Sequence, residues 1–398
     1  MTESKRTTSR RLRLCVIISS FAVEGPQGGA ERFAIEMVRR LDLEALEVTV
    51  CGLWDHGLAH ERKWRALLHE QGIATVTTTA WTEHRWPDAI RALRFLRRYF
   101  SEHPQDIINS HSAFADIAAT WGRLCGGARW LVRILHSEHE WYRHRLVGLV
   151  LNQILFPWVF AVEAGVSQKI ASDLNRRPLA RLLRRRARVL YNAIAWERFA
   201  DRTIDVLAKR GSLGLPPDAL VIGNVGRFTR QKGHRYLIEA MSRVIEHHPN
   251  CHLLLVGDGE LRGRIEEQVA RENLSSHVHF LGVRSDIEEI LQTMDLFVSP
   301  SLWEGLPTVI LEAMAARVPV ICTAVSGSSE LVENGHTGLI VKPGSGDALA
   351  EAILNLLGNM DRARQMADNA YAYARRFSID EVAAEYNRLF TAYCREMK

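Results

Sequence analysis

The sequence predicts an α/β protein with two doubly wound, Rossmann-like domains that face each other across a cleft. Its 398 residues are enough for two domains of ordinary size. Apolar, β-branched segments alternate with helical segments along both halves, as parallel sheets require. Polar side chains follow the ends of many apolar segments, where an open parallel sheet binds its ligands.

In the first half, residues 1–200, we expect the first Rossmann-like domain. A glycine-containing loop opens an amphipathic helix within residues 24–41, and a basic helix lies within 81–100. A further helix starts at Ser167. Strands are expected at residues 12–19, 47–53, 106–110, 130–135, 160–166 and 188–191.

Residues 201–218 turn from charged to rich in glycine and proline, so we place an interdomain linker there. A second Rossmann-like domain is expected over residues 219–375. Its strands are predicted at residues 220–226, 251–256, 278–281, 296–298, 318–323 and 338–341. The last segment, 376–398, is predicted to be a helix that packs back toward the first domain.

Charge is distributed unevenly between the halves. The first 200 residues carry 30 Lys and Arg against 20 Asp and Glu, a net charge of +10, whereas the whole chain has +5. We therefore expect the first half to face an anionic partner or surface. The six cysteines form no C-x-x-C pair, which favours a reduced, cytoplasmic protein.

Two apolar segments raise the question of targeting. The basic residues 5–13 and the apolar run after them could be a signal peptide, but the run is short and a buried strand is favoured. The longest apolar tract, 147–162, is interrupted by polar residues and falls short of the roughly 20 residues of a spanning helix.

The segment 299–313 carries two carboxylates around a predicted helix start. An apolar strand ends at Ser299, a loop holds Glu304, and Pro307 occupies the expected first helical position, with Glu312 inside the helix. The five residues from Pro307 to Glu312 span roughly 7 to 8 Å. Free N–H groups between the acids favour an anion such as a diphosphate. The alternative is that both acids serve only solubility and the helix.

Two cations follow another predicted strand end. Arg227 and Lys232 lie five residues apart in a loop that starts at Gly226. Together they could neutralise a diphosphate and the charge that develops as it leaves. The alternative is a solvated basic loop.

Glycines and histidines mark the cleft side of the first half. Gly28 and Gly29 open a helix, where their backbone could approach a phosphate, although a plain turn is the alternative and the G-x-G-x-x-G spacing is absent. His111 ends one strand. A denser cluster, His136, Glu138 and His139, follows the next, and acceptor contact is favoured over metal binding because no third ligand stands at a recognised spacing.

Two basic segments, 91–98 and 176–188, carry apolar or aromatic neighbours. Such segments can lie on anionic lipid surfaces, and a merely solvated face is the alternative. Nucleic acid is not an expected partner because no nucleic-acid motif is visible.

The second half resembles a known family. The segments GRFTRQKG, VGDGEL, SPSLWEGLPTVILEAMA and VPVICTAVSGSSELVENGHTGLIV resemble the nucleotide-binding half of the GT-B retaining glycosyltransferases of family 4, also called glycosyl transferases group 1. Glu304 and Glu312 match the family's E-x7-E pair. In the first half the resemblance is thinner, over GGAER, DIINSHSAFADIAA, HSEHE, VSQKI and VLYNAI.

The resemblance implies a role for each matching residue. Glu304 would contact the transferred sugar and Glu312 the ribose. Arg227 and Lys232 would bind the diphosphate, whose distal phosphate would meet backbone groups of Gly305, Leu306 and Thr308. Gly29 would line the donor from the first domain, and His111 would lie near the anomeric centre. The segment 325–330 departs from the family's frequent Gly-Gly pair, which leaves the fine donor contacts open.

The resemblance also implies an activity. We expect a retaining, metal-independent transfer of a sugar from a nucleoside diphosphate sugar, UDP rather than GDP, to a glycan or lipid-linked acceptor. Cell-surface polysaccharide or lipopolysaccharide synthesis would be the setting, with the protein in the cytoplasm or peripheral on the inner face of the membrane. The alternatives are a GT-B nucleotide-sugar 2-epimerase and a catalytically silent, donor-binding subunit of a polysaccharide assembly complex.

Overall fold

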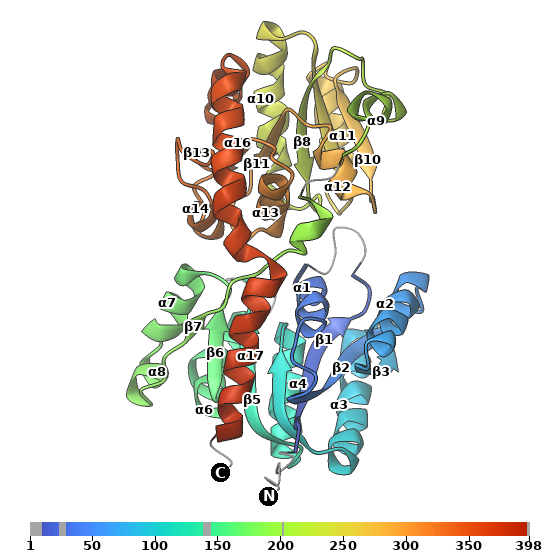
Figure 1. The fold of residues 1–398 in the computed structure, drawn as a ribbon, viewed down its shortest axis with the longest axis vertical. Helices are drawn as coiled ribbons and strands as arrows, with labels where there is room; N and C mark the ends of the chain where they lie inside the picture. Colours follow the sequence, from blue (N-terminus) through green and yellow to red (C-terminus); the bar gives the residue numbers. More distant parts are fainter. Residues whose placement is uncertain (1–9, 24–28, 138–144, 201–202, 396–398) are drawn as a thin grey trace, which may run out of the picture.

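The protein consists of two stacked α/β units with the chain crossing between them twice (Figure 1). The structure is a computed structural model and describes residues 10–23, 29–137, 145–200 and 203–395. Within these residues no helix is both long and apolar enough to cross a membrane.

The first unit contains a seven-stranded parallel sheet in the order β3-β2-β1-β4-β5-β6-β7. Six of its strands were predicted; β3, a threonine-rich edge strand, was not. Its strands are β1 (Leu12–Ser20), β2 (Leu46–Asp55), β3 (Ala74–Ala80), β4 (Gln105–Ser110), β5 (Ala128–Leu135), β6 (Val162–Gly165) and β7 (Arg188–Val189). Its helices are α1 (Gly29–Val38), α2 (Ala59–Glu70), α3 (Arg85–Glu102), α4 (Ala113–Leu124), α5 (Arg145–Val150), the π-helix η2 (Leu151–Leu155), α6 (Phe156–Val159), α7 (Gln168–Arg176) and α8 (Pro178–Leu182).

The second unit contains a six-stranded parallel sheet in the order β10-β9-β8-β11-β12-β13. Its strands are β8 (Leu220–Val225), β9 (Cys251–Val256), β10 (Val278–Gly282), β11 (Leu296–Ser299), β12 (Val320–Thr323) and β13 (Leu339–Val341). Around it lie η4 (Arg230–Lys232), α10 (His234–His247), α11 (Arg262–Arg271), α12 (Ile287–Leu291), α13 (Thr308–Ala315), α14 (Ser326–Leu331), α15 (Gly346–Leu357) and α16 (Met360–Ala374).

Both sheets reverse their strand order at one point, between β1 and β4 and between β8 and β11. Ligands of doubly wound sheets bind at such points, beyond the carboxyl ends of the strands. The loops after β1, β4, β8 and β11 carry the predicted glycines, His111, the two cations and Glu304. The topology therefore positions the predicted site.

The region predicted as the linker, 201–218, holds helix α9 (Val206–Ser212). This helix is fixed to the second unit, since Lys209 Nζ lies 2.6 Å from both Asp286 Oδ2 and Glu289 Oε2 and Arg210 Nη2 lies 2.9 Å from Asp295 Oδ2. Residues 206–212 of the predicted linker thus pack on the second unit.

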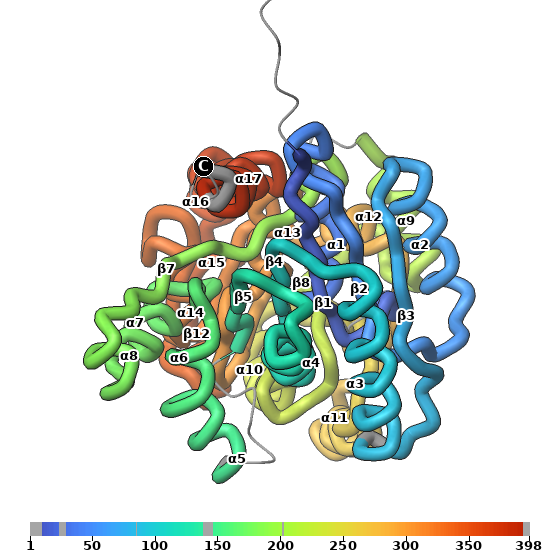
Figure 2. Tube along the Cα trace, turned by 90° about the horizontal axis from the view of Figure 1, so that it is seen from below, coloured from blue at the N-terminus to red at the C-terminus, as the bar shows by residue number. Residues whose placement is uncertain are grey.

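The two chain crossings are bonded to each other. The Ile194 N–H donates to the Phe377 carbonyl (3.1 Å), and the Ile379 N–H donates to the Ile194 carbonyl (2.8 Å). Beyond this point α17 (Ile379–Arg395) runs back along the first unit beside α1 (Figures 1 and 2). Tyr386 of α17 is fully buried there, with its ring 5.9 Å from that of Phe33.

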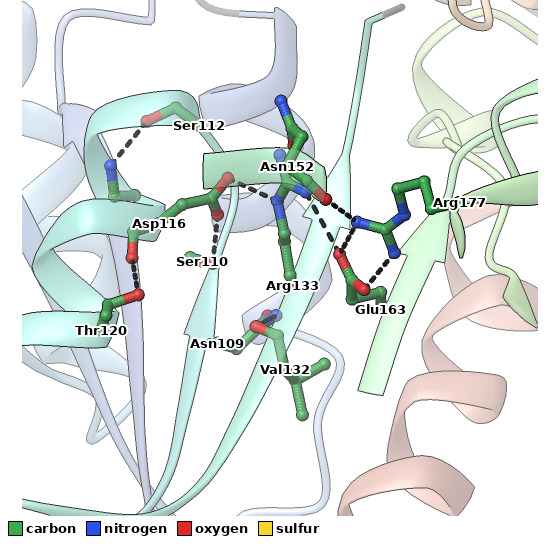
Figure 3. A network of polar contacts seen from close by, with 11 residues as sticks. Asn109, Ser110, Ser112, Asp116, Thr120, Val132, Arg133, Asn152, Glu163 and Arg177 are labelled. Carbon is green, nitrogen blue, oxygen red and sulfur yellow. Dashed lines mark hydrogen bonds and ion pairs between the residues drawn. The ribbon is translucent and has the colours of Figure 1, made fainter. Parts of the chain in front are cut away.

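A chain of four buried charges crosses the first unit (Figure 3). Arg133 of β5 donates from Nε to Asp116 Oδ2 (2.6 Å) and from Nη1 to Glu163 Oε1 (3.2 Å), and Arg177 also bonds Glu163. Burial raises the pKa of Asp116 to about 6 despite these cations. The network stabilises the fold only while it stays complete, because each lone charge would be buried without a partner.

Replacing Arg133 tests this. We expect Arg133→Leu to lower the free energy of unfolding by about 3 to 5 kcal/mol, since Asp116 and Glu163 lose their shared cation. Urea titration measures it. Arg98→Leu is the control, because Arg98 pairs with Glu102 at the surface of α3 and should contribute at most about 1 kcal/mol. Equal urea midpoints for the two variants would contradict the role of the network.

Candidate functional site

A cavity of about 360 Å³ lies between the two units, within the range of small-ligand pockets. Both units contribute to its walls: the start of α1 and the end of β5 from the first, and the loops after β8 and β11 from the second. Ten residues predicted for the site line it: Gly29, His136, Gly226, Arg227, Lys232, Glu304, Gly305, Leu306, Thr308 and Glu312. His111 does not line it, and Gly28, Glu138 and His139 lie outside the described residues.

Glu304 is the most firmly held of these groups. Its carboxylate is nearly buried and accepts hydrogen bonds from Ser301 Oγ (2.7 Å) and Lys232 Nζ (2.6 Å) through Oε1. Gln231 Nε2 donates to its other oxygen (3.3 Å). Three donors keep the carboxylate oriented toward the cavity.

The loop that carries the cations is locked against the loop that carries Glu304. Gly233 has a φ of +66°, and a Cβ there would lie 2.1 Å from the Pro300 carbonyl oxygen, so only glycine fits. The Leu302 N–H donates to the Gln231 carbonyl (2.7 Å). This packing places Lys232 on Glu304, while Arg227, at the end of β8, stays exposed on the cavity wall.

The N-terminus of α13 points its free N–H groups at the same cavity. The helix begins at Thr308, and Pro307 is its N-cap, so the predicted first helical position was wrong by one residue. Glu312 lies one turn further. Burial raises its pKa, and Arg32 of α1 opposes this from across the cavity. A phosphate between Arg227, Lys232 and this helix end would meet positive charge from three directions.

Two histidines at the ends of neighbouring strands contact each other behind the cavity, with their rings tilted by 34°. His111 Nε2 lies 2.7 Å from Asn109 Oδ1, and His111 Nδ1 lies 3.1 Å from His136 Nε2. Burial lowers the pKa of both rings, that of His136 to about 4, so both are neutral at pH 7. Only His136 lines the cavity. His111 can therefore affect a ligand only through its contact with the His136 ring.

Three contacts hold the units together beside the cavity. A Cβ on Gly305 would lie 1.9 Å from the His136 carbonyl oxygen, so the two backbones touch. Asn192 Nδ2 donates to the Leu306 carbonyl (3.3 Å). The carboxylate of Glu330 accepts from the N–H groups of Gln168 (2.8 Å) and Lys169 (3.2 Å), the first residues of α7. Glu330 thus caps a helix of the other unit.

Sequence reasoning missed several charged residues of the site. Arg32 of α1 lines the cavity. Burial raises the pKa of Glu31 and of Glu312, and Arg227 and Arg32, respectively, oppose the rise. Arg198 and Arg284 also line the cavity. The position of Glu31 and Arg32 in the first turn after Gly29 was the available signal, because the first turn of a helix after β1 faces the ligand in this topology.

The described residues contain no group of three or more His, Cys, Asp or Glu side chains that could hold a metal ion. The fixed positive charges on the cavity wall are instead Arg32, Arg198, Arg227, Lys232 and Arg284.

His234, next to the cation loop, is buried without partners. Neither of its ring nitrogens has a hydrogen bond within the described part of the chain, and its ring meets Phe228 edge-on at 4.8 Å. Burial, with Lys232 nearby, lowers its pKa to about 3. In an unfolded chain the pKa of histidine is near 6.5. Below that pH the unfolded chain binds a proton that the buried ring does not, so the free energy of unfolding falls as the pH decreases from 6.5 toward 3.

We expect His234→Leu to raise the free energy of unfolding at pH 7 by about 1 to 3 kcal/mol, because it removes an unsatisfied polar group. Between pH 7 and pH 5 the free energy of unfolding of the wild type should also fall by about 2 kcal/mol more than that of the variant. Urea unfolding at both pH values measures this, with the exposed His247→Leu as control. If His234→Leu left the pH dependence of stability unchanged, the lowered pKa of His234 would be refuted.

Comparisons with known proteins agree with this architecture. The family described as "Glycosyl transferases group 1" matches residues 205–373, and the family described as "Glycosyltransferase Family 4" matches residues 27–198. The crystal structure of Anabaena Alr3699/HepE in complex with UDP and glucose has the same fold, with a TM-score of 0.79 at 22% identity over 96% of this chain and 100% of that one.

Two relatives have higher identity over shorter regions. EpsF of Bacillus subtilis (strain 168) is 32% identical over 260 residues, which are 63% of this chain and 65% of EpsF. The UDP-Gal:alpha-D-GlcNAc-diphosphoundecaprenol alpha-1,3-galactosyltransferase of Escherichia coli is 28% identical over 279 residues, 67% of this chain and 70% of that protein. The chain thus spans about two thirds of the length of either relative.

Proposed function

Because the chain belongs to family 4 of the GT-B glycosyltransferases, we propose that it transfers a sugar, with retention, from a nucleoside diphosphate sugar to a glycan or lipid-linked acceptor. The observation that carries the proposal is the contact of Lys232 with Glu304 beside the N-terminus of α13. It brings a phosphate-binding cation, a hydroxyl-binding carboxylate and a helix dipole to one wall of the cavity.

In the proposed complex the diphosphate lies against Arg227, Lys232 and the N–H groups of residues 305–308. Glu304, at the sugar end, accepts hydrogen bonds from sugar hydroxyls, and Glu312 binds the ribose. The cations and the helix dipole stabilise the charge that gathers on the diphosphate as it leaves. Their positions are fixed before the donor binds, which lowers the cost of reorganisation.

For retention, the acceptor attacks the face of the sugar from which the diphosphate departs. The bond from the anomeric carbon to the phosphate oxygen breaks and a bond to the acceptor oxygen forms. The acceptor's proton passes to the leaving diphosphate. His136 is neutral and lies at the first-domain wall, so it can hydrogen-bond sugar or acceptor without adding charge. His111 and Asn109 hold its ring in place.

UDP is the proposed nucleotide, and the proposed acceptor is carried by a lipid. HepE is described in complex with UDP and with UDP-glucose, and the Escherichia coli relative uses UDP-Gal and a diphosphoundecaprenol acceptor by name. A relative from Rhizobium meliloti is named for lipopolysaccharide core biosynthesis. We propose the same setting here, in the cytoplasm or at the inner face of the membrane, with no metal cofactor and no nucleic-acid partner.

Lys232→Ala and Glu304→Ala test the assignment. Each should lower kcat by about 10² to 10³, because each removes a fixed charge that acts on the transition state. Arg230→Ala is the control, since Arg230 is an exposed neighbour in the same loop and does not line the cavity. A screen of UDP- and GDP-sugars with product analysis gives the rates, and a chelator should leave them unchanged.

Wild-type turnover in both folded variants would refute the function. Release of a free epimerised nucleotide sugar would show an epimerase, and donor binding without turnover would show a silent subunit.

Gly305→Ala tests the contact between the units. The added Cβ would lie 1.9 Å from the His136 carbonyl oxygen, so the two backbones would have to move apart and the two walls of the cavity would separate. A displacement of about 1 Å is enough to lower kcat/KM by about 10². Gly263→Ala in α11 is the control, because its Cβ would meet open space. Equal kcat/KM in the two variants would show that turnover does not need the contact between Gly305 and the His136 carbonyl.

A further inference from the structure

The outer side of one helical segment exposes a row of large apolar side chains. Helices α5, η2 and α6 follow one another without a break over residues 145–159. We call their outward-facing side chains the apolar ridge: Leu146, Val147, Leu149, Val150, Ile154 and Trp158, with exposed fractions between 48% and 81%. Few soluble proteins leave so many large apolar side chains together in water.

The inner side of the same segment is apolar too. Phe156 is fully buried, and Leu151, Leu155 and Val159 pack against the same core cluster of the first unit. A helical segment with apolar side chains on two opposite sides is typical of a position between two apolar surroundings. The first unit supplies only one of them.

The ridge is straight because of the π-helix. In an α-helix, residues four apart shift steadily around the axis. The wider i→i+5 turn of η2, between α5 and α6, winds the chain less tightly and offsets that shift. Leu146, Val150, Ile154 and Trp158 therefore remain on one side of the segment.

A basic rim lies beside the ridge. Helix α8 packs against η2 and α6, and the chain after it leads to β7 (Figure 2). We define the rim as Arg181, Arg184, Arg185, Arg186 and Arg188, all of them exposed. Leu182, between them, is 78% exposed. Among the described residues none of the five arginines forms an ion pair.

The carboxylates of this region are already occupied. Glu163 is buried in the network of Arg133 and Arg177, and Asp173 pairs with Lys169 and Arg176. The charge of the rim is therefore not neutralised by nearby described acids. A partner that carries negative charge beside apolar material would complement both features.

The buried network mounts the ridge rigidly on the sheet. Arg177 donates from Nη1 to the Asn152 carbonyl within η2 (2.8 Å; Figure 3). The Arg133 guanidinium lies 4.4 Å from the ring centre of Phe156 in α6. A ridge that is exposed yet fixed by buried arginines is preformed for a partner.

We infer that the apolar ridge and the basic rim dock the protein onto an anionic lipid leaflet. The ridge lies at the boundary between headgroups and acyl chains, and the rim meets the lipid phosphates. The segment is too short to span the bilayer, so it lies in the interface plane. A second copy of this chain is the weaker occupant, because two basic rims would repel each other across a two-fold interface.

Docking here would present the cleft to a lipid-borne acceptor, a consequence that rests on the proposed function. Strand β5 ends beside His136 on the cavity wall, and the chain that leaves it leads to α5. The wall of the site and the ridge both belong to the first unit, before and after residues 138–144, which lie outside the described residues. An acceptor headgroup that extends from the leaflet would approach from the His136 side.

Vesicle flotation of the full chain tests the docking. We expect binding to phosphatidylcholine vesicles that contain phosphatidylglycerol, little binding to pure phosphatidylcholine, and weaker binding at high salt. Ile154→Ser/Trp158→Ser should weaken binding at least tenfold, since two large side chains lose their apolar contact. Arg184→Ala/Arg185→Ala/Arg186→Ala should weaken it about 100-fold at low salt, about fivefold per arginine.

Matched controls locate the surface. Leu58→Ser/Leu207→Ser changes two exposed leucines away from the ridge, and Arg94→Ala/Arg97→Ala/Arg98→Ala removes three exposed arginines of α3, as many as the rim variant removes. Both should bind like the wild type. Absence of wild-type binding to anionic vesicles, or loss of binding in the α3 variant with retention in the rim variant, would overturn the inference.

Two further readouts separate the explanations. A change in oligomeric state of Ile154→Ser/Trp158→Ser by light scattering, with no vesicle binding, would assign the ridge to a second copy and overturn docking. UDP binding and turnover without vesicles report on the proposed function alone. Vesicle binding can therefore be absent while Lys232→Ala still lowers turnover, which would refute docking alone. Vesicle binding can also be present while Lys232→Ala leaves turnover unchanged, which would refute the proposed function alone.

Discussion

The close approach of Gly305 to the His136 carbonyl is the constraint on which the cavity depends. It brings the end of β5 and the loop before α13 into direct backbone contact, and no side chain larger than hydrogen fits between them. Asn192 and Glu330 add directional hydrogen bonds on the same side. The backbone bonds between the crossings, Ile194 with Phe377 and Ile379, join the two connecting segments to each other. Together these contacts fix how far apart the two walls of the cavity lie.

Lys232 and Glu304 neutralise each other on one wall of the cavity. A cation and a carboxylate this poorly hydrated would each be costly to leave alone. In the proposed complex, a diphosphate would offer Lys232 a second anion, while Ser301 and Gln231 would keep Glu304 oriented. Both groups would then already stand where the proposed reaction needs them, and binding would only redistribute their hydrogen bonds. The proposed catalysis depends on such preorganisation.

The sequence predicted what local patterns encode. Twelve of the thirteen strands follow from apolar runs, and the missed one, β3, is a half-exposed edge strand rich in threonine. Arg227, Lys232, Glu304 and Glu312 were found because each lies in a short loop or helix start with its own signal. The relation of His111 to His136 was not predictable, since both end parallel strands and only packing decides which ring faces the cavity. Arg32 lies in the first turn after Gly29, which was a usable signal, but its partner Glu312 is distant in the chain and only the fold brings the two together.

The surface formed by the apolar ridge and the basic rim shows the same division between local and tertiary information. Both basic segments, 91–98 and 176–188, look alike as sequence. In the structure Arg91 and Arg98 of α3 pair with Asp88 and Glu102. In the second segment Arg176 and Arg177 pair with Asp173 and Glu163, and the arginines of the rim form no ion pair among the described residues. The apolar tract 147–162 is too short to span a bilayer, and the fold gives its apolar residues two other places. Its residues are divided between the core and the ridge, and a segment with two apolar sides on a basic domain fits a water–lipid boundary better than either phase.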